Sequence, residues 1–323
     1  MSKKSMAARR QMREAAAEGR LPGARQQSRS RTKGRNYRRN TSGRPWGLIS
    51  GVVGVVAVFV IVVVLIDISL QGALKQDTKV LPAPASLVTA LANIPAQTLD
   101  AVKGGAIANY PVNIPSSYKP VALSAKGLPE VGFVGAEYCP YCAVQRWSLI
   151  IGLSPFGTWS GLHTIRSSVY DAPSNIPTFS FAYGAKLTSK YLVFSTHELE
   201  SNVSISKTGA PYKSLQSVTG PLATAYSTID TASGYPFLDY AGKLAQVGSE
   251  EGTTTTDVAA LQDLSWNKVL TKLRDPKSPI AQVVLGGANY VTAATCTITG
   301  NKPAAVCNSS RITTLESQLA ASA

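Results

Sequence analysis

Three consecutive segments decide the fold of this chain: residues 131–138 (VGFVGAEY), residues 139–142 (CPYC) and residues 143–153 (AVQRWSLIIGL). The first segment has the short, apolar composition of a buried strand. The last segment has helix-forming composition with recurring apolar side chains. A strand, a Cys-x-x-Cys pair and a helix in this order are typical of a redox-active cysteine site in an α/β fold.

The place of the cysteine pair at a helix start predicts its chemistry. Cys139 precedes the helix, where free backbone N–H groups and the helix dipole favour negative charge. Its pKa is therefore expected to fall, so that a thiolate forms near neutral pH. Cys142 lies one turn along and is close enough to attack a mixed disulfide on Cys139. We expect Cys139 to be the nucleophile and Cys142 the resolving thiol.

Three neighbours of the pair are candidate supporting residues. Pro140 suits the first helical turn, where its missing N–H costs no hydrogen bond, and Tyr141 separates it from the second thiol. Arg146 is four residues beyond Cys142. It either adds positive charge on that helix face or is a surface cation.

Other uses of the pair stay open. It could be half of a zinc site with Cys296 and Cys307, although structural zinc usually shows two short spacings. It could also form a permanent structural disulfide, or belong to a redox fold that has kept binding and lost catalysis. His163 and His197 lie in no metal-ligand or triad spacing, and no phosphate loop or dinucleotide fingerprint occurs, so we expect no metal and no cofactor.

The segment around the pair also resembles known proteins. Residues 137–142 (EYCPYC) resemble the active-site segment of the thioredoxin superfamily, and the CPYC form is similar to glutaredoxin. The longer stretch 134–147, continuing to residues 156–159 (FGTW), resembles the uncharacterised DUF929 family of actinobacterial and archaeal proteins, over about residues 86–307. The resemblance implies a thioredoxin-like fold, and the family has no established substrate.

Thioredoxin-like proteins place a cis-proline beside the cysteine pair, and two candidates exist. Pro177 begins an apolar segment, but residues 162–168 precede it too closely for a parallel crossover, which needs about a dozen residues. Those two segments predict an antiparallel hairpin instead. Pro236 follows an expected helix at residues 221–229 and begins a strand that turns at Ala241 and Gly242. We therefore favour Pro236, with Tyr235, and expect residues 156–220 to be an insertion.

One residue departs from the superfamily pattern. Many thioredoxins carry a buried acid six residues before the first cysteine, and this chain has Phe133 there. A reductase with thioredoxin-like acid–base behaviour is therefore in doubt.

The N-terminal part of the chain predicts a membrane anchor. Residues 1–46 hold 14 of the 32 Lys and Arg residues and two acidic ones, so the high net charge of +14 lies mostly in this segment. We expect a disordered basic cytoplasmic tail, attracted to anionic lipid rather than nucleic acid. Residues 47–66 are uncharged and long enough to cross a bilayer. A cleaved signal peptide is the rival interpretation, but the following residues offer no convincing cleavage site.

The remaining segments complete the expected organisation. Residues 67–120 are expected to be a linker with a short helical segment, and residues 121–256 the thioredoxin-like domain. Residues 257–323 have helical periodicity and are expected to be a C-terminal extension. Cys296 and Cys307 are expected to form a structural disulfide there, and a second redox pair that relays electrons is the alternative.

Together these features predict a single-pass membrane protein whose main domain lies outside the cytoplasm. The expected function is thiol–disulfide exchange on exported proteins, as an oxidase or isomerase rather than a reductase, because that compartment is oxidising. The expected partners are exported thiols and disulfides, a membrane redox partner and the lipid bilayer. The alternative is a non-catalytic thioredoxin-like scaffold or a metal-binding module of the cell envelope.

Overall fold

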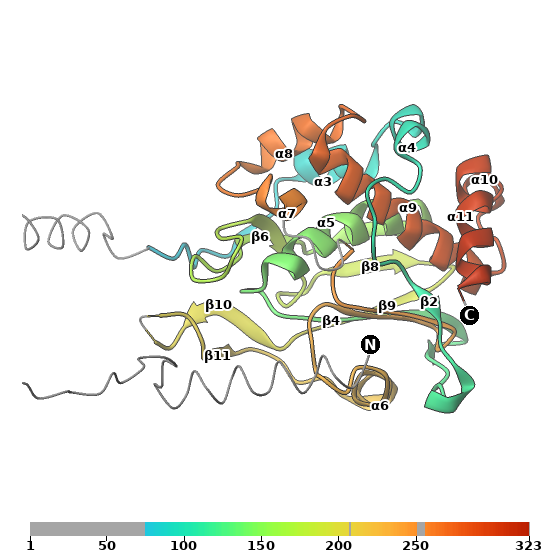
Figure 1. Ribbon diagram of the computed structural model, residues 1–323, viewed down its shortest axis with the longest axis horizontal. Helices are drawn as coiled ribbons and strands as arrows, with labels where there is room; N and C mark the ends of the chain where they lie inside the picture. Colours follow the sequence, from blue (N-terminus) through green and yellow to red (C-terminus); the bar gives the residue numbers. More distant parts are fainter. Residues whose placement is uncertain (1–74, 207, 251–255, 323) are drawn as a thin grey trace, which may run out of the picture. The chain divides into compact units, whose positions relative to one another are not determined.

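The computed structural model describes residues 75–206, 208–250 and 256–322 as a mixed α/β structure (Figure 1). The strands are β1 (Leu81–Pro82), β2 (Val112–Asn113), β3 (Ser124–Ala125), β4 (Leu128–Gly135), β5 (Gly157–Ser160), β6 (His163–Arg166), β7 (Pro177–Ser180), β8 (Lys186–Ser189), β9 (Val193–Glu198), β10 (Glu200–Ser204), β11 (Tyr212–Ser214), β12 (Phe237–Tyr240) and β13 (Leu244–Val247). The helices are α3 (Ala85–Ala92), α4 (Ala96–Val102), α5 (Pro140–Leu153), α6 (Gly220–Ile229), α7 (Thr256–Ala259), α8 (Trp266–Leu273), α9 (Pro279–Thr299), α10 (Ala304–Cys307) and α11 (Ser310–Ala321), with 3₁₀ turns at Ser116–Tyr118 and Ser154–Phe156.

The strand before the cysteine pair, β4, lies at the centre of the main sheet. It pairs in parallel with β9, from Glu130 opposite Val193 to Gly135 opposite Glu198. On its other side it pairs antiparallel with β12, which forms a hairpin with β13. The short strand β2 pairs with β13, and the short strand β3 pairs with β4. The largely apolar sequence of β4, with Glu130 near its start, follows from this place, because a central strand is covered on both faces.

The two faces of the sheet carry separate cores, and alternate residues of β4 point into each. Val131 and Phe133 pack with α5 and α9 in the larger core. Val134 packs with Leu222 of α6 in the smaller one. Gly132 faces the same way, and a Cβ there would come within 2.5 Å of Leu222. Figure 1 shows α5 and α9 on one side of the sheet and α6 on the other.

Helices α5 and α9 pack against each other and run in the same direction. Ser148 Oγ donates to the Val284 carbonyl, and Thr292 Oγ1 donates to the Gly152 carbonyl one turn further along. A Cβ on Gly152 would lie 2.6 Å from the Ala288 carbonyl oxygen and 2.8 Å from Val291. The glycine therefore permits the close approach of the two backbones.

Three small sheets surround this core, and they revise the expected insertion. The expected antiparallel hairpin is β6–β7, with β1 added at its edge, while β5 pairs with β8 and β10 with β11. Strand β9, however, lies inside residues 156–220 and is a full member of the main sheet. The added structure is therefore strands β5 to β8, which precede β9 in the sequence, and strands β10 and β11, which follow it.

The flanking segments also belong to the same unit. The short helical segment expected within residues 67–120 is two helices, α3 and α4, and Pro95 between them is the N-cap residue of α4. Strand β2 lies in the expected linker, and α9 of the expected C-terminal extension covers the sheet. These segments complete the core.

Within residues 75–206, 208–250 and 256–322, no helix combines the length and apolar character that a membrane span requires. The expected span at residues 47–66 and the basic tail lie outside the described residues.

The contact at Gly152 makes a testable prediction. In an open helix, Gly→Ala stabilises by about 1 kcal/mol. Here we expect Gly152→Ala to destabilise the protein by about 1–3 kcal/mol, because the methyl group overpacks the α5–α9 contact. Urea unfolding of the full chain in detergent micelles measures the change. Exposed Ser317→Ala in α11 is the control and should be neutral or slightly stabilising. A gain in stability for Gly152→Ala would contradict the close contact.

Candidate redox site

The cysteine pair lies where β4 passes into α5. Cys139 is the N-cap residue of α5, and its sulfur accepts a hydrogen bond from the Cys142 N–H at 3.3 Å. Pro140 occupies the first helical turn, as its fixed φ favours. Both thiols are free. Cys139 keeps 6% of its surface exposed and Cys142 none, so any reagent meets Cys139 first.

The two thiols differ in acidity. Burial alone raises the pKa of Cys139, but hydrogen bonds from the Cys142 thiol and N–H, together with the charge of Arg146, outweigh it and lower the pKa below its ordinary value. Burial raises the pKa of Cys142 well above its ordinary value, and the Cys139 thiolate raises it further. The site therefore favours one thiolate, on the more exposed sulfur.

The positive charge beside the thiols comes from a buried ion pair. Arg146 is fully buried, so it is not a surface cation. Its Nε and Nη2 donate to the two carboxylate oxygens of Glu198 at 2.8 and 2.6 Å, and Nη2 also donates to the Ala136 carbonyl at 2.7 Å. The guanidinium also lies 5.8 Å from the ring centre of Phe133. The Arg146–Glu198 ion pair, with the bond to Ala136, thus connects α5, the end of β9 and the loop before Cys139.

A second buried acid, Glu137, belongs to the same cluster and was missed by the sequence analysis. Its side chain is almost fully buried, and the Ser180 hydroxyl and the backbone at Asn202 face its carboxylate. Burial raises its pKa to about 7; the nearby Ser180 hydroxyl and Arg146 offset this in part, while the charge of Glu198 adds to it. The sequence signal that could have identified Glu137 is a single acidic residue directly after an apolar strand. Glu198, 56 residues beyond Cys142 in the sequence, had no such signal.

Tyrosines surround the mouth of the site. The Tyr138 ring stacks on Tyr212 at 4.0 Å and meets Tyr235 edge-on at 6.3 Å. Burial raises the pKa of Tyr235 to about 12, and negative charge on Glu200 and on both thiols contributes. The Tyr235–Pro236 peptide bond is cis, whereas the bond before Pro177 is not among the cis bonds of the described residues. Tyr235 and Pro236 thus lie at the same edge of the sheet as the cysteine pair. Tyr141, half-buried, packs against the larger core.

The other two cysteines lie elsewhere. Cys296 in α9 and Cys307 in α10 form a disulfide, and both are buried. Gly152 at the far end of α5 already contacts Ala288 and Val291, and Cys296 is further along α9. The thirteen residues from Cys139 to Gly152 span roughly 20 Å. The structure therefore separates the disulfide from the thiol pair.

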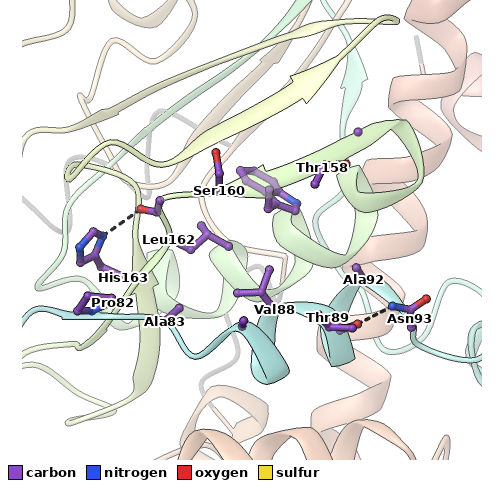
Figure 2. Close-up of a pocket in the computed structure, with 14 residues that line it drawn as sticks. Pro82, Ala83, Val88, Thr89, Ala92, Asn93, Thr158, Ser160, Leu162 and His163 are labelled. Atoms are coloured by element: carbon purple, nitrogen blue, oxygen red, sulfur yellow. Dashed lines mark hydrogen bonds between the residues drawn. The ribbon is translucent and has the colours of Figure 1, made fainter.

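A cavity of about 530 Å³ lies away from the thiols, between α3 and the β5–β6 segment. Figure 2 shows Val88, Leu162 and Pro82 in its lining, with His163 hydrogen-bonded to the Gly161 carbonyl at 3.0 Å. Its described lining is largely apolar or hydroxyl-bearing. None of the described lining residues carries a thiol or a carboxyl group.

Comparison with known proteins identifies one family. Residues 116–210 match the family model of DUF929, a domain of unknown function. The match confirms the resemblance to DUF929, over a shorter stretch than the expected residues 86–307, and its segment contains β4, the cysteine pair, Arg146 and Glu198. No curated protein and no solved structure matches the chain.

The buried ion pair makes a prediction about stability. Arg146→Met leaves Glu198 buried without its partner, and we expect a loss of about 3–5 kcal/mol in the free energy of unfolding. The double variant Arg146→Met/Glu198→Gln should cost clearly less than the sum of the single changes, because it removes both charges. Urea unfolding of the full chain and the three variants completes the cycle. Additive losses would show that the two side chains do not interact.

The raised pKa of Glu137 makes a prediction about pH. Its folded pKa of about 7 lies above the ordinary 4.5, so the stability it contributes is present below pH 4.5 and is lost as the pH rises through 7. The shift corresponds to about 3 kcal/mol. Glu137→Gln should therefore gain about that much relative to the wild type between pH 4.5 and 8, measured by urea unfolding across this range. Burial also raises the pKa of Asp239 to about 7. Because Asp239 is present in both proteins, its contribution cancels from the difference between them. A constant difference at all pH values would contradict the raised pKa.

Proposed function

We propose that this chain, whose residues 116–210 belong to DUF929, is a membrane-anchored thiol–disulfide oxidoreductase with a thioredoxin-like domain. Cys139 is the attacking thiolate and Cys142 the resolving thiol. The observation that carries the proposal is the difference between the two sulfurs. One is the slightly exposed helix N-cap with a lowered pKa, and the other is fully buried with a raised pKa.

The order of elements supports the thioredoxin-like part of the proposal. The main sheet has the order β9–β4–β12–β13, with β9 parallel and β12 antiparallel to β4. Helix α5 connects β4 to β9 through the added hairpins, and α6 precedes β12. The cysteine pair follows β4 and a cis-proline precedes β12. The same arrangement is expected of a thioredoxin-like core.

The surroundings of the pair support exchange over a purely structural role. A thiolate must form before exchange begins, and Arg146 with the helix N-terminus favours it at Cys139. The tyrosines around the opening offer apolar ring faces and hydroxyl groups to a polypeptide substrate. The disulfide at Cys296–Cys307 is consistent with an oxidising compartment, which favours oxidase or isomerase activity on exported proteins. A membrane redox partner then resets the pair.

Equilibration in glutathione buffers tests the proposal. We expect the Cys139–Cys142 pair of the full chain in detergent micelles to have a reduction potential between about −120 and −270 mV, the range of exchange catalysts. Cys142→Ser should trap a glutathione adduct on Cys139, detected by mass spectrometry. Cys139→Ser is the matched control and should trap little, because Cys142 is buried and its thiol holds its proton.

A potential below about −300 mV with no trapped adduct would make the bond structural. That result would favour the scaffold alternative. Equal trapping on both cysteines would contradict the assigned roles.

A further inference from the structure

The added hairpin β10–β11 is bonded to the segment that leads from β4 to Cys139. The Leu199 N–H donates to the Gly135 carbonyl, and the Glu137 N–H donates to the Glu200 carbonyl, each at 2.8 Å. The start of the hairpin therefore lies against the backbone that carries the first cysteine. Thiol–disulfide exchange itself involves only sulfur atoms, so the place of this hairpin beside the site calls for a separate explanation.

Tyr212 of β11 packs its ring on Tyr138, the residue directly before Cys139. The ring centres are 4.0 Å apart, and the two planes are nearly parallel, with 5° between them. Tyr212 is buried, whereas Tyr138 is only half-buried. One face of the Tyr138 ring is thus covered by a buried residue, while part of the ring stays accessible to a substrate.

Ser168 holds both tyrosines from a third segment, the loop between β6 and β7. Its backbone N–H donates to the Tyr138 carbonyl at 2.8 Å, and its hydroxyl accepts a hydrogen bond from the Tyr212 hydroxyl at 2.7 Å. The Tyr212 hydroxyl also lies 3.4 Å from an Asp171 carboxylate oxygen. Ser168 is fully buried. One buried residue therefore fixes both the backbone of Tyr138 and the ring that stacks on it.

Access to the thiol is narrow, and the fixed ring lies beside it. Cys139 is almost completely buried, and Tyr235, which precedes the cis-proline, meets the Tyr138 ring edge-on at 6.3 Å. A disulfide that reaches the Cys139 sulfur therefore brings its flanking residues against Tyr138. A ring that is fixed before binding loses less freedom when a substrate contacts it. Fixing Tyr138 thus favours a cysteine with polypeptide on both sides over a small disulfide without such flanks.

We propose that Tyr212 is a positioning residue, which holds the Tyr138 ring beside Cys139 and makes the site selective for cysteines within polypeptide segments over small disulfides. This inference rests on the proposed function and narrows its substrate class. In the exchange step the Cys139 sulfur bonds to one substrate sulfur, and the bond between the two substrate sulfurs breaks. The second substrate sulfur leaves as a thiolate with the electron pair. Tyr212 takes no part in these bond changes and acts only through the ring of Tyr138.

Rates of adduct formation with two disulfides test the proposal. The Cys142→Ser form of the full chain, in detergent micelles, stops the reaction at the mixed disulfide. One probe is the symmetric disulfide of a short unstructured peptide with a central cysteine, and the other is hydroxyethyl disulfide. Acid quenching and mass spectrometry give the second-order rate constant of adduct formation on Cys139 for each probe. The selectivity is the rate constant for the peptide divided by that for the small disulfide.

In Tyr212→Leu we expect the selectivity to fall about 2- to 10-fold, because Tyr138 becomes mobile and has to be fixed on binding. The rate constant for hydroxyethyl disulfide should stay unchanged. Tyr212→Phe keeps the stacked ring and should retain most of the selectivity. Tyr138→Leu should lose at least as much, and adding Tyr212→Leu to it should lower the selectivity no further, because the two residues act as one unit.

Tyr110→Leu is the matched control, because it removes one ring of another stacked tyrosine pair. Tyr110 lies parallel to Tyr290 of α9, with 4.8 Å between the ring centres. Tyr290 follows Ala288, which contacts Gly152 at the far end of α5 from Cys139. Both rate constants of Tyr110→Leu should therefore match those of the parent form.

The outcomes separate this proposal from the proposed function. If the Cys142→Ser form makes no adduct with either probe, the proposed function itself is wrong. If the adduct forms and Tyr212→Leu keeps the full selectivity, or slows both probes equally, only the role of Tyr212 is overturned. Independent losses in Tyr138→Leu and Tyr212→Leu, which multiply in the double variant, would overturn it too. Tyr212→Met, with the same expected loss, replaces Tyr212→Leu if the latter does not fold.

Discussion

The buried ion pair between Arg146 and Glu198 is the interaction on which the site depends. Two buried charges are costly unless they are closely paired, and here Nε and Nη2 of Arg146 each donate to one carboxylate oxygen of Glu198. The pair fixes α5 against the end of β9, and the added bond to the Ala136 carbonyl fixes the loop before Cys139. The position of the Cys139 sulfur therefore follows from an interaction that lies entirely inside the protein.

The same arrangement explains how two identical side chains come to differ in pKa. Cys139 stands where the backbone of α5 offers unpaired N–H groups, and Cys142 stands one turn inside, under the sheet end and out of contact with solvent. Charge at the first sulfur is stabilised by Arg146, and that charge in turn opposes ionisation of the second. The asymmetry in pKa comes from the burial of Cys142, from the hydrogen bonds that Cys142 makes to Cys139, and from the charge of Arg146.

Much of this architecture was accessible from the sequence, and the exceptions have a common cause. Local patterns predicted β4, α5, the β6–β7 hairpin, α6 and the β12–β13 hairpin, because each is encoded by its own composition and turn residues. The place of β9 beside β4 was not predicted, since strand pairing over some 60 residues leaves no local signal. For the same reason Glu198 was missed, and Arg146 was left undecided between a site residue and a surface cation. Glu137 lies within the motif itself, but its burial was not predicted.

The parallel packing of α5 on α9 has a consequence for how the four cysteines are kept apart. Four cysteines allow three pairings, and two of these would join the Cys139–Cys142 site to the Cys296–Cys307 clamp. With roughly 20 Å of helix between the two sites, no sulfur of one pair can reach a sulfur of the other while α5 stays against α9. The contact at Gly152 therefore helps to keep the two pairs apart, so that each cysteine can reach only the other member of its own pair.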